Sequence, residues 1–94
     1  MAEGEPLFKL GMVVATPGAL RLMLLTNVQP QTLLRRHVTG DWSEMDAEDQ
    51  AANNEAVQHG LRIFSAYRVS PTERIWCITK SDRSATTFLK PSEY

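Results

Sequence analysis

The chain has 94 residues, of which 43% are hydrophobic and 22% are charged, and its formal net charge is −1 at pH 7. These values are typical of one small globular domain, and the near-neutral charge excludes a general electrostatic attraction to nucleic acid or anionic lipid. The single cysteine, Cys77, excludes an internal disulfide and a cysteine-based zinc site, and no apolar run reaches the roughly 18–20 residues of a membrane span.

The N-terminal segment 1–6 is polar and contains a glycine and a proline, so we expect it to be flexible. It has two glutamates and no basic region before an apolar stretch, which is unlike a secretory signal. We therefore predict a cytoplasmic protein with one α+β domain over residues 7–94.

A strand and a helix are predicted first. The apolar run at 12–15 is typical of a strand, and Gly11 before it indicates a bulge or bend. Thr16 followed by a proline has the form of a helix start. Residues 18–25 are apolar almost all round, so we expect a short, well-buried helix.

Two more helices are predicted before residue 60. Pro30 begins the second, whose apolar face includes His37 and which ends near Gly40. The third is expected from about residue 47 to residue 59, with Asp46 as its N-terminal cap, Gly60 at its end and an acidic first turn. Its stripe of small residues consists of Ala52, Ala56 and Val57, with Ala51 beside them.

The segment 61–90 alternates apolar and polar residues in three runs, 61–69, 74–80 and 85–90, which predicts three strands. Turn residues at 70–73 and 81–84 separate them. Short links require antiparallel pairing, because a parallel pair needs a crossover of a dozen residues or more. We expect an α+β fold: a three- to four-stranded antiparallel meander with two or three short helices on one face.

No residue pattern indicates catalysis. His37, Asp41 and Asp82 could form a small active site, but His37 at an apolar helix face is explained equally by packing. Cys77 lies in the middle of a strand, where a buried thiol is inert. The acidic residues from Asp41 to Glu55 lack the spacing of a calcium loop. We expect no enzyme activity, no cofactor and no metal.

Two kinds of binding remain. Trp42 lies in a loop and is either a core anchor or an exposed binding residue. Basic residues on the strands, interleaved with Trp76 and Phe88, are similar to a stacking platform for single-stranded nucleic acid. The residues that we expect at an interaction surface are His37, Asp41, Trp42, Arg62, Arg74, Asp82 and Arg83.

Several segments together resemble a known family. They are VVATPGAL at 13–20, RRHVTGDW at 35–42, DAEDQAANNEA at 46–56, GLRIFSAY at 60–67, IWCIT at 75–79, DRSATT at 82–87 and the ending KPSEY. The chain resembles small uncharacterised bacterial proteins that occur on plasmids and other mobile elements, some of which are labelled as a restriction–modification methyltransferase subunit. The resemblance implies a background of mobile DNA and host defence. This chain lacks the Gly-rich cofactor loop and the N-P-P-Y-type motif of such a methyltransferase.

We therefore predict a non-enzymatic protein-interaction module of a mobile element that modulates a host defence system. The alternative is a single-stranded nucleic-acid-binding module that uses the basic and aromatic residues of the sheet. The sequence is also compatible with a homodimer, and the partner's identity is open.

Overall fold

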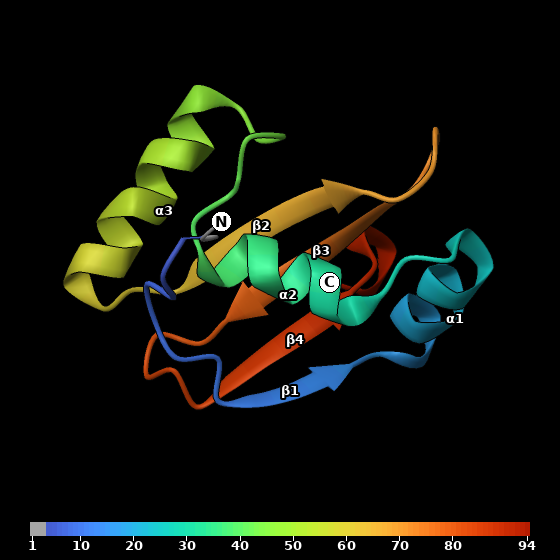
Figure 1. Ribbon diagram of the computed structural model, residues 1–94, viewed down its shortest axis with the longest axis horizontal. Coiled ribbons are helices and arrows are strands. Elements are labelled where there is room, and N and C mark those ends of the chain that lie inside the picture. The colour runs from blue at the N-terminus through green and yellow to red at the C-terminus, as the bar shows by residue number, and fades with distance from the viewer. Residues whose placement is uncertain (1–3) are drawn as a thin grey trace.

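A computed structural model describes residues 4–94, which form an α+β fold of one four-stranded sheet and three helices (Figure 1). The elements in chain order are β1 (Met12–Ala15), α1 (Pro17–Thr26), α2 (Pro30–Val38), α3 (Ala47–His59), β2 (Ile63–Arg68), β3 (Arg74–Thr79), β4 (Ala85–Leu89) and a 3-10 turn, η1 (Pro91–Glu93). Half of the segment expected to be flexible, residues 1–3, lies outside the described residues.

The strand order is β1-β4-β3-β2. Strands β2, β3 and β4 form the predicted antiparallel meander. The prediction needs one correction, because β1 pairs with β4 in parallel and places Val13 opposite Thr86. The sheet is therefore mixed. The crossover between β1 and β4 contains all three helices, which satisfies the long connection that a parallel pair requires.

One face of the sheet is covered by α2, which crosses it, and by α1 at the end of β1 (Figure 1). Buried side chains of these helices and of β2, β3 and β4 meet there in one cluster: Ala19, Leu22, Met23, Leu33, Tyr67, Ile75, Cys77 and Phe88. We call the other side of the sheet the open face. Its strand residues are Phe64, Ala66, Arg68, Arg74, Trp76, Ile78, Thr87 and Leu89.

Helix α1 begins as predicted, with the Thr16 side chain accepting a hydrogen bond from the backbone N–H of Ala19 (3.1 Å). The prediction that α1 is well buried is wrong. Ala19, Leu22 and Met23 are buried, whereas three leucines, Leu20, Leu24 and Leu25, face solvent. The sheet ends beneath α1 at β1, so the helix has the core on one side only.

Helix α3 stands beside β2 rather than over the sheet (Figure 1). Its buried residues are Asn53 and Ala56. Of the predicted small-residue stripe, Ala56 is buried and Val57 is half-buried, whereas Ala51 and Ala52 are exposed. Ala56 packs with Trp42 and Ile63 in a second apolar cluster. This cluster fixes the chain between α2 and α3 against the sheet.

Candidate interaction surface

Two residues expected at an interaction surface, Trp42 and His37, are buried. Trp42 is 3% exposed and packs with Ala56 and Ile63, and its indole N–H donates to the Asn54 side chain (3.3 Å). Trp42 therefore serves as the core anchor, one of the two roles that its sequence position allowed. It offers no area to a partner.

His37 links α2 to the sheet through a buried polar chain. Its Nδ1 contacts the Ser65 hydroxyl, and its Nε2 lies 2.8 Å from the Thr79 hydroxyl. Thr79 contacts Thr86, whose hydroxyl donates to the backbone C=O of Leu10 (2.7 Å). Burial, with the nearby charge of Arg83, lowers the pKa of His37 to about 4. A neutral imidazole with both nitrogens engaged explains this residue structurally.

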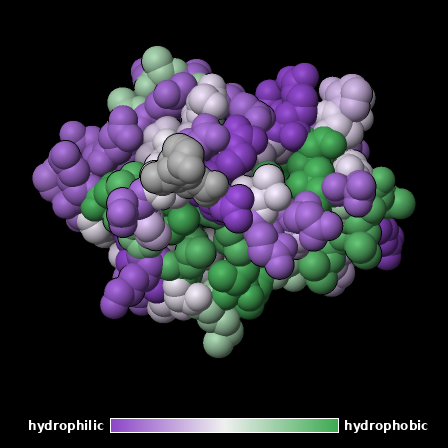
Figure 2. Space-filling model, in the orientation of Figure 1, coloured by the Kyte–Doolittle hydropathy of each residue, from purple (hydrophilic) through white to green (hydrophobic). Residues whose placement is uncertain are grey.

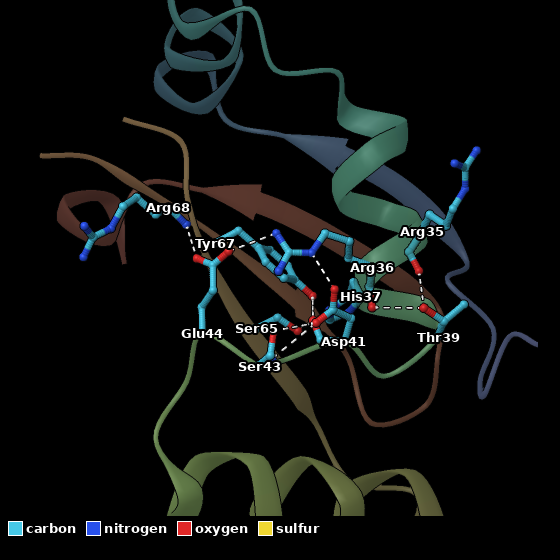
Figure 3. Close-up of polar contacts among 10 residues, drawn as sticks. All are labelled: Arg35, Arg36, His37, Thr39, Asp41, Ser43, Glu44, Ser65, Tyr67 and Arg68. Atoms are coloured by element: carbon cyan, nitrogen blue, oxygen red, sulfur yellow. Dashed lines mark hydrogen bonds and ion pairs between the residues drawn. The ribbon is translucent and has the colours of Figure 1, made fainter. Parts of the chain in front are cut away.

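Asp41 belongs to a polar network that ties α2 to β2 (Figure 3). Arg36 Nε donates to Asp41 (2.7 Å), its Nη1 lies 3.0 Å from Glu44, and the guanidinium lies 4.5 Å from the centre of the Tyr67 ring. Tyr67 in turn donates to the backbone C=O of Asp41 (2.8 Å). The hydrogen bond from Arg36 lowers the pKa of Asp41 below its ordinary value. The network therefore holds the loop after α2 against β2.

Arg83 and Asp82 lie in the turn between β3 and β4. Arg83 donates to the backbone C=O of Leu61 (2.6 Å) and of Ala56 (3.0 Å), so it joins the turn to the end of α3. Asp82 accepts from the backbone N–H of Ser84 (3.0 Å), as turn aspartates do. Both residues therefore have local structural roles.

Arg62 and Arg74 lie on the open face or beside it, together with Trp76. Arg62 donates to the hydroxyl of Tyr94 (2.8 Å), whose ring packs edge-on against Trp76 at 5.4 Å between centres. The predicted interleaving of basic residues with Phe88 is wrong, because Phe88 is buried on the helix-covered face. The open face keeps one partly exposed indole, and the hollow that it lines also contains Arg74 and the acidic residues Glu44, Asp46 and Asp49.

The two edges of the sheet differ. At the outer edge of β2, the Asn53 side chain donates to the backbone C=O of Phe64 (2.7 Å) and accepts from the N–H of the same residue (3.2 Å). Glu44 accepts from the backbone N–H of Arg68 (2.7 Å). Helix α3 and the loop before it thus occupy three of the backbone groups with which a further strand would pair, the N–H and C=O of Phe64 and the N–H of Arg68.

The outer edge of β1 is open. The backbone N–H groups of Met12 and Thr16 donate to Ser84 and Phe88 on the β4 side (2.9 and 3.0 Å). Because the hydrogen-bonding direction alternates along a strand, the N–H and C=O groups of Val13 and Ala15 point away from the sheet. A further strand could pair there.

Apolar side chains surround this open edge. We define the apolar surface as Met12, Val13, Val14, Leu20, Leu24 and Leu25, whose exposed fractions range from 42% at the valines to 82% at Leu24. Figure 2 shows the corresponding hydrophobic areas over α1 and along β1. A hollow of about 210 Å³ lies between them, lined by residues that include Val13, Ala15, Leu20 and Met23. The surface therefore combines an apolar groove with the open outer edge of β1.

Comparisons with protein-family models, curated proteins and solved structures gave no match for this chain. The surface must therefore be interpreted from its own chemistry. No helix among residues 4–94 is long and apolar enough to cross a membrane.

This surface was not predicted from the sequence. A signal is nevertheless present, because the helix at 18–25 is apolar except for Arg21 and the run at 12–15 has no polar residue. For the helix, this pattern predicts burial within the domain. The same pattern also describes elements at the border of a small domain, where one side packs inward and the other is available to a partner.

Proposed function

We propose that this protein is a non-enzymatic protein-interaction module that binds through its apolar surface. The observation that supports this proposal is the exposure of Leu24 (82%) and Leu25 (77%) next to the open edge of β1. Exposed patches of this extent on a small domain are typical of protein interaction sites. The three residues that could have formed a small active site make structural contacts instead: His37 in the core, Asp41 in an ion pair and Asp82 in a turn.

The biological setting of the proposal comes from the resemblance alone. A module of a plasmid or another mobile element would act in the cytoplasm on a protein of the host, and a defence protein is our proposed target. A small domain can act in this way without chemistry, because an apolar groove gives a partner a place to insert its own side chains.

The test is quantitative affinity capture from lysates of bacteria that carry restriction and other defence systems. The tagged wild type is compared with Leu24→Asp and with Leu61→Asp as the matched control. Leu61 is also exposed (52%) but lies before β2, outside the apolar surface. We expect a partner retained by the wild type and the control and reduced at least tenfold by Leu24→Asp. Equal retention by all three proteins would contradict the proposal.

A second candidate function is single-stranded nucleic-acid binding on the open face. The observation that favours it is the partly exposed Trp76 with Arg74 in the same strand. Arg74 also lines a separate hollow of about 460 Å³ together with Arg68, Lys90 and Glu73. Base stacking on an indole contributes roughly 1–3 kcal/mol. Fluorescence anisotropy with single-stranded DNA at low salt tests it. Binding that Trp76→Ala does not weaken, or no binding at tens of micromolar protein, would exclude this face.

A further inference from the structure

We infer that two copies of this chain pair through the outer edges of their β1 strands, antiparallel about a twofold axis, so that two four-stranded sheets become one. The inference rests on the proposed function, because it concerns the same apolar surface: the second copy covers this surface in the free protein, and a target protein would have to displace that copy. It is carried by the open backbone edge, the shape of the hollow beside it and the blocked edge at β2.

The backbone of β1 is suited to pair with itself. Val13 and Ala15 each present an outward N–H and C=O, so in an antiparallel pair Val13 of one copy lies opposite Ala15 of the other and both exchange hydrogen bonds. The twofold axis then passes beside Val14, which faces its own copy at a non-hydrogen-bonded position. Every outward group of the strand finds a partner in this register.

The side chains agree with this register. Residues directly opposite in a pair share one face of the sheet, so Val13 of the second copy lies next to Ala15 on the helix-covered face. The hollow of about 210 Å³ between Ala15, Leu20 and Met23 is at that position. The second copy's valine would fill it, and Val14 would pack on Val14 on the other face.

Charge and area also favour a second copy. The apolar surface contains no charged residue, so it does not repel its own copy and does not select a partner of opposite charge. The surface consists of six side chains that are 42–82% exposed, whereas an interface of standard size takes about 20–30 residues a side. A contact of this smaller size predicts a reversible dimer.

The edge at β2 determines where association stops. A sheet with two open edges could add copies without limit, whereas a contact made by the same surface on both partners closes at two. Asn53 occupies the backbone groups of Phe64 and Glu44 that of Arg68, so among the described residues β1 is the edge without such cover. The structure therefore fits a closed dimer rather than a filament.

The first experiment measures mass in solution by light scattering at roughly 100 µM, where a dimer with a micromolar dissociation constant is well populated. We expect twice the chain mass of 10.6 kDa for the wild type and the single mass for Val13→Pro. Proline there removes only the outward N–H, so the bonds to β4 and the circular dichroism spectrum should remain unchanged. A monomeric wild type at this concentration would overturn the inference.

The second experiment tests the register by cross-linking. Val14→Cys should form a disulfide-linked dimer under mild oxidation, because it faces itself across the axis. The matched control Val13→Cys should not, because its two copies lie two residues apart along the strands, beyond the reach of a disulfide. Cys77 is buried and does not interfere. Equal cross-linking of both variants would overturn the proposed register.

The inference and the proposed function fail in different ways. If the wild type is monomeric but Leu24→Asp still abolishes capture of a partner, the second copy is refuted and the interaction module stands. Hydrogen exchange of Val13 and Ala15 with the captured partner present then shows whether that partner's strand occupies the edge. If mass and capture are both unaffected by substitutions in the apolar surface, both proposals are wrong.

Discussion

Replacing Asn53 with leucine should destabilise the domain although the substituted side chain has a similar size. Asn53 is buried in α3, and its amide both donates to and accepts from the backbone of Phe64 on β2. Leucine can do neither. The change therefore leaves an N–H and a C=O of the sheet edge without partners while it keeps the volume of the core contact.

The size of the effect follows from these two bonds. A hydrogen bond contributes about 0.5–1.5 kcal/mol net, and a buried group left without a partner costs up to about 3 kcal/mol. Water can reach part of this edge, so we take about 2 kcal/mol for the pair. A domain of this length has a free energy of unfolding of about 5–14 kcal/mol. The melting temperature should fall by about 8–16 °C.

Urea denaturation followed by tryptophan fluorescence measures this loss, since Trp42 lies in the cluster beneath α3 and Trp76 lies in the sheet. Gln58→Leu provides the control, because Gln58 is an exposed residue of the same helix. The midpoint should decrease for Asn53→Leu with an unchanged slope, and the control should stay within about 0.5 kcal/mol of the wild type. A similar midpoint for both variants would refute the assignment of Asn53 to the edge.

Two further predictions concern His37 and Gly11. The pKa of His37 is about 4 in the folded chain and 6.5 when unfolded, so the unfolded state binds the proton first as the pH falls. The contribution of His37 to the free energy of unfolding should therefore be complete above about pH 7 and decrease by up to about 3 kcal/mol towards pH 4. Urea titrations at several pH values measure this decrease, and His37→Gln should not show it. Gly11 has φ +66°, and a Cβ there would lie 2.4 Å from the backbone of Ser84, whereas Gly60 has the same φ with nothing within 4 Å. Gly11→Ala should lower the melting temperature much more than Gly60→Ala does. The Gly60 variant measures the cost of the left-handed backbone alone, roughly 1–2 kcal/mol. Equal losses for the two variants would show that the contact between the new Cβ and Ser84 is unimportant.

Local features of the fold were predictable from the sequence because their causes are local. Alternation placed β2, β3 and β4, and the caps at Thr16, Asp46 and Gly60 fixed the start of α1 and both ends of α3. The partner of β1 was not predictable in this way. Its parallel pairing with β4 joins residues more than seventy positions apart, and no periodicity within either strand records it.

The candidate site was harder to predict, because burial depends on which elements meet. Trp42 and His37 have amphipathic side chains, which occur both at surfaces and in cores. The neighbouring residues in the sequence do not distinguish these two locations. Leucines of α1 were assigned to the core because the helix lacks a polar side. Asn53 follows two alanines in the sequence, and this pattern does not indicate that its side-chain amide forms hydrogen bonds to a strand.

The unequal edges of the sheet connect these observations. Soluble proteins protect exposed strands with charges, prolines, bulges or a covering element. Strand β2 has such protection from Asn53 and Glu44, while β1 reads Met-Val-Val-Ala and has no charge or proline within it. An unprotected apolar strand in a sheet whose other edge is covered would favour aggregation unless something pairs with it. The four residues that the sequence predicts as a strand are therefore the part of this domain that most needs a partner.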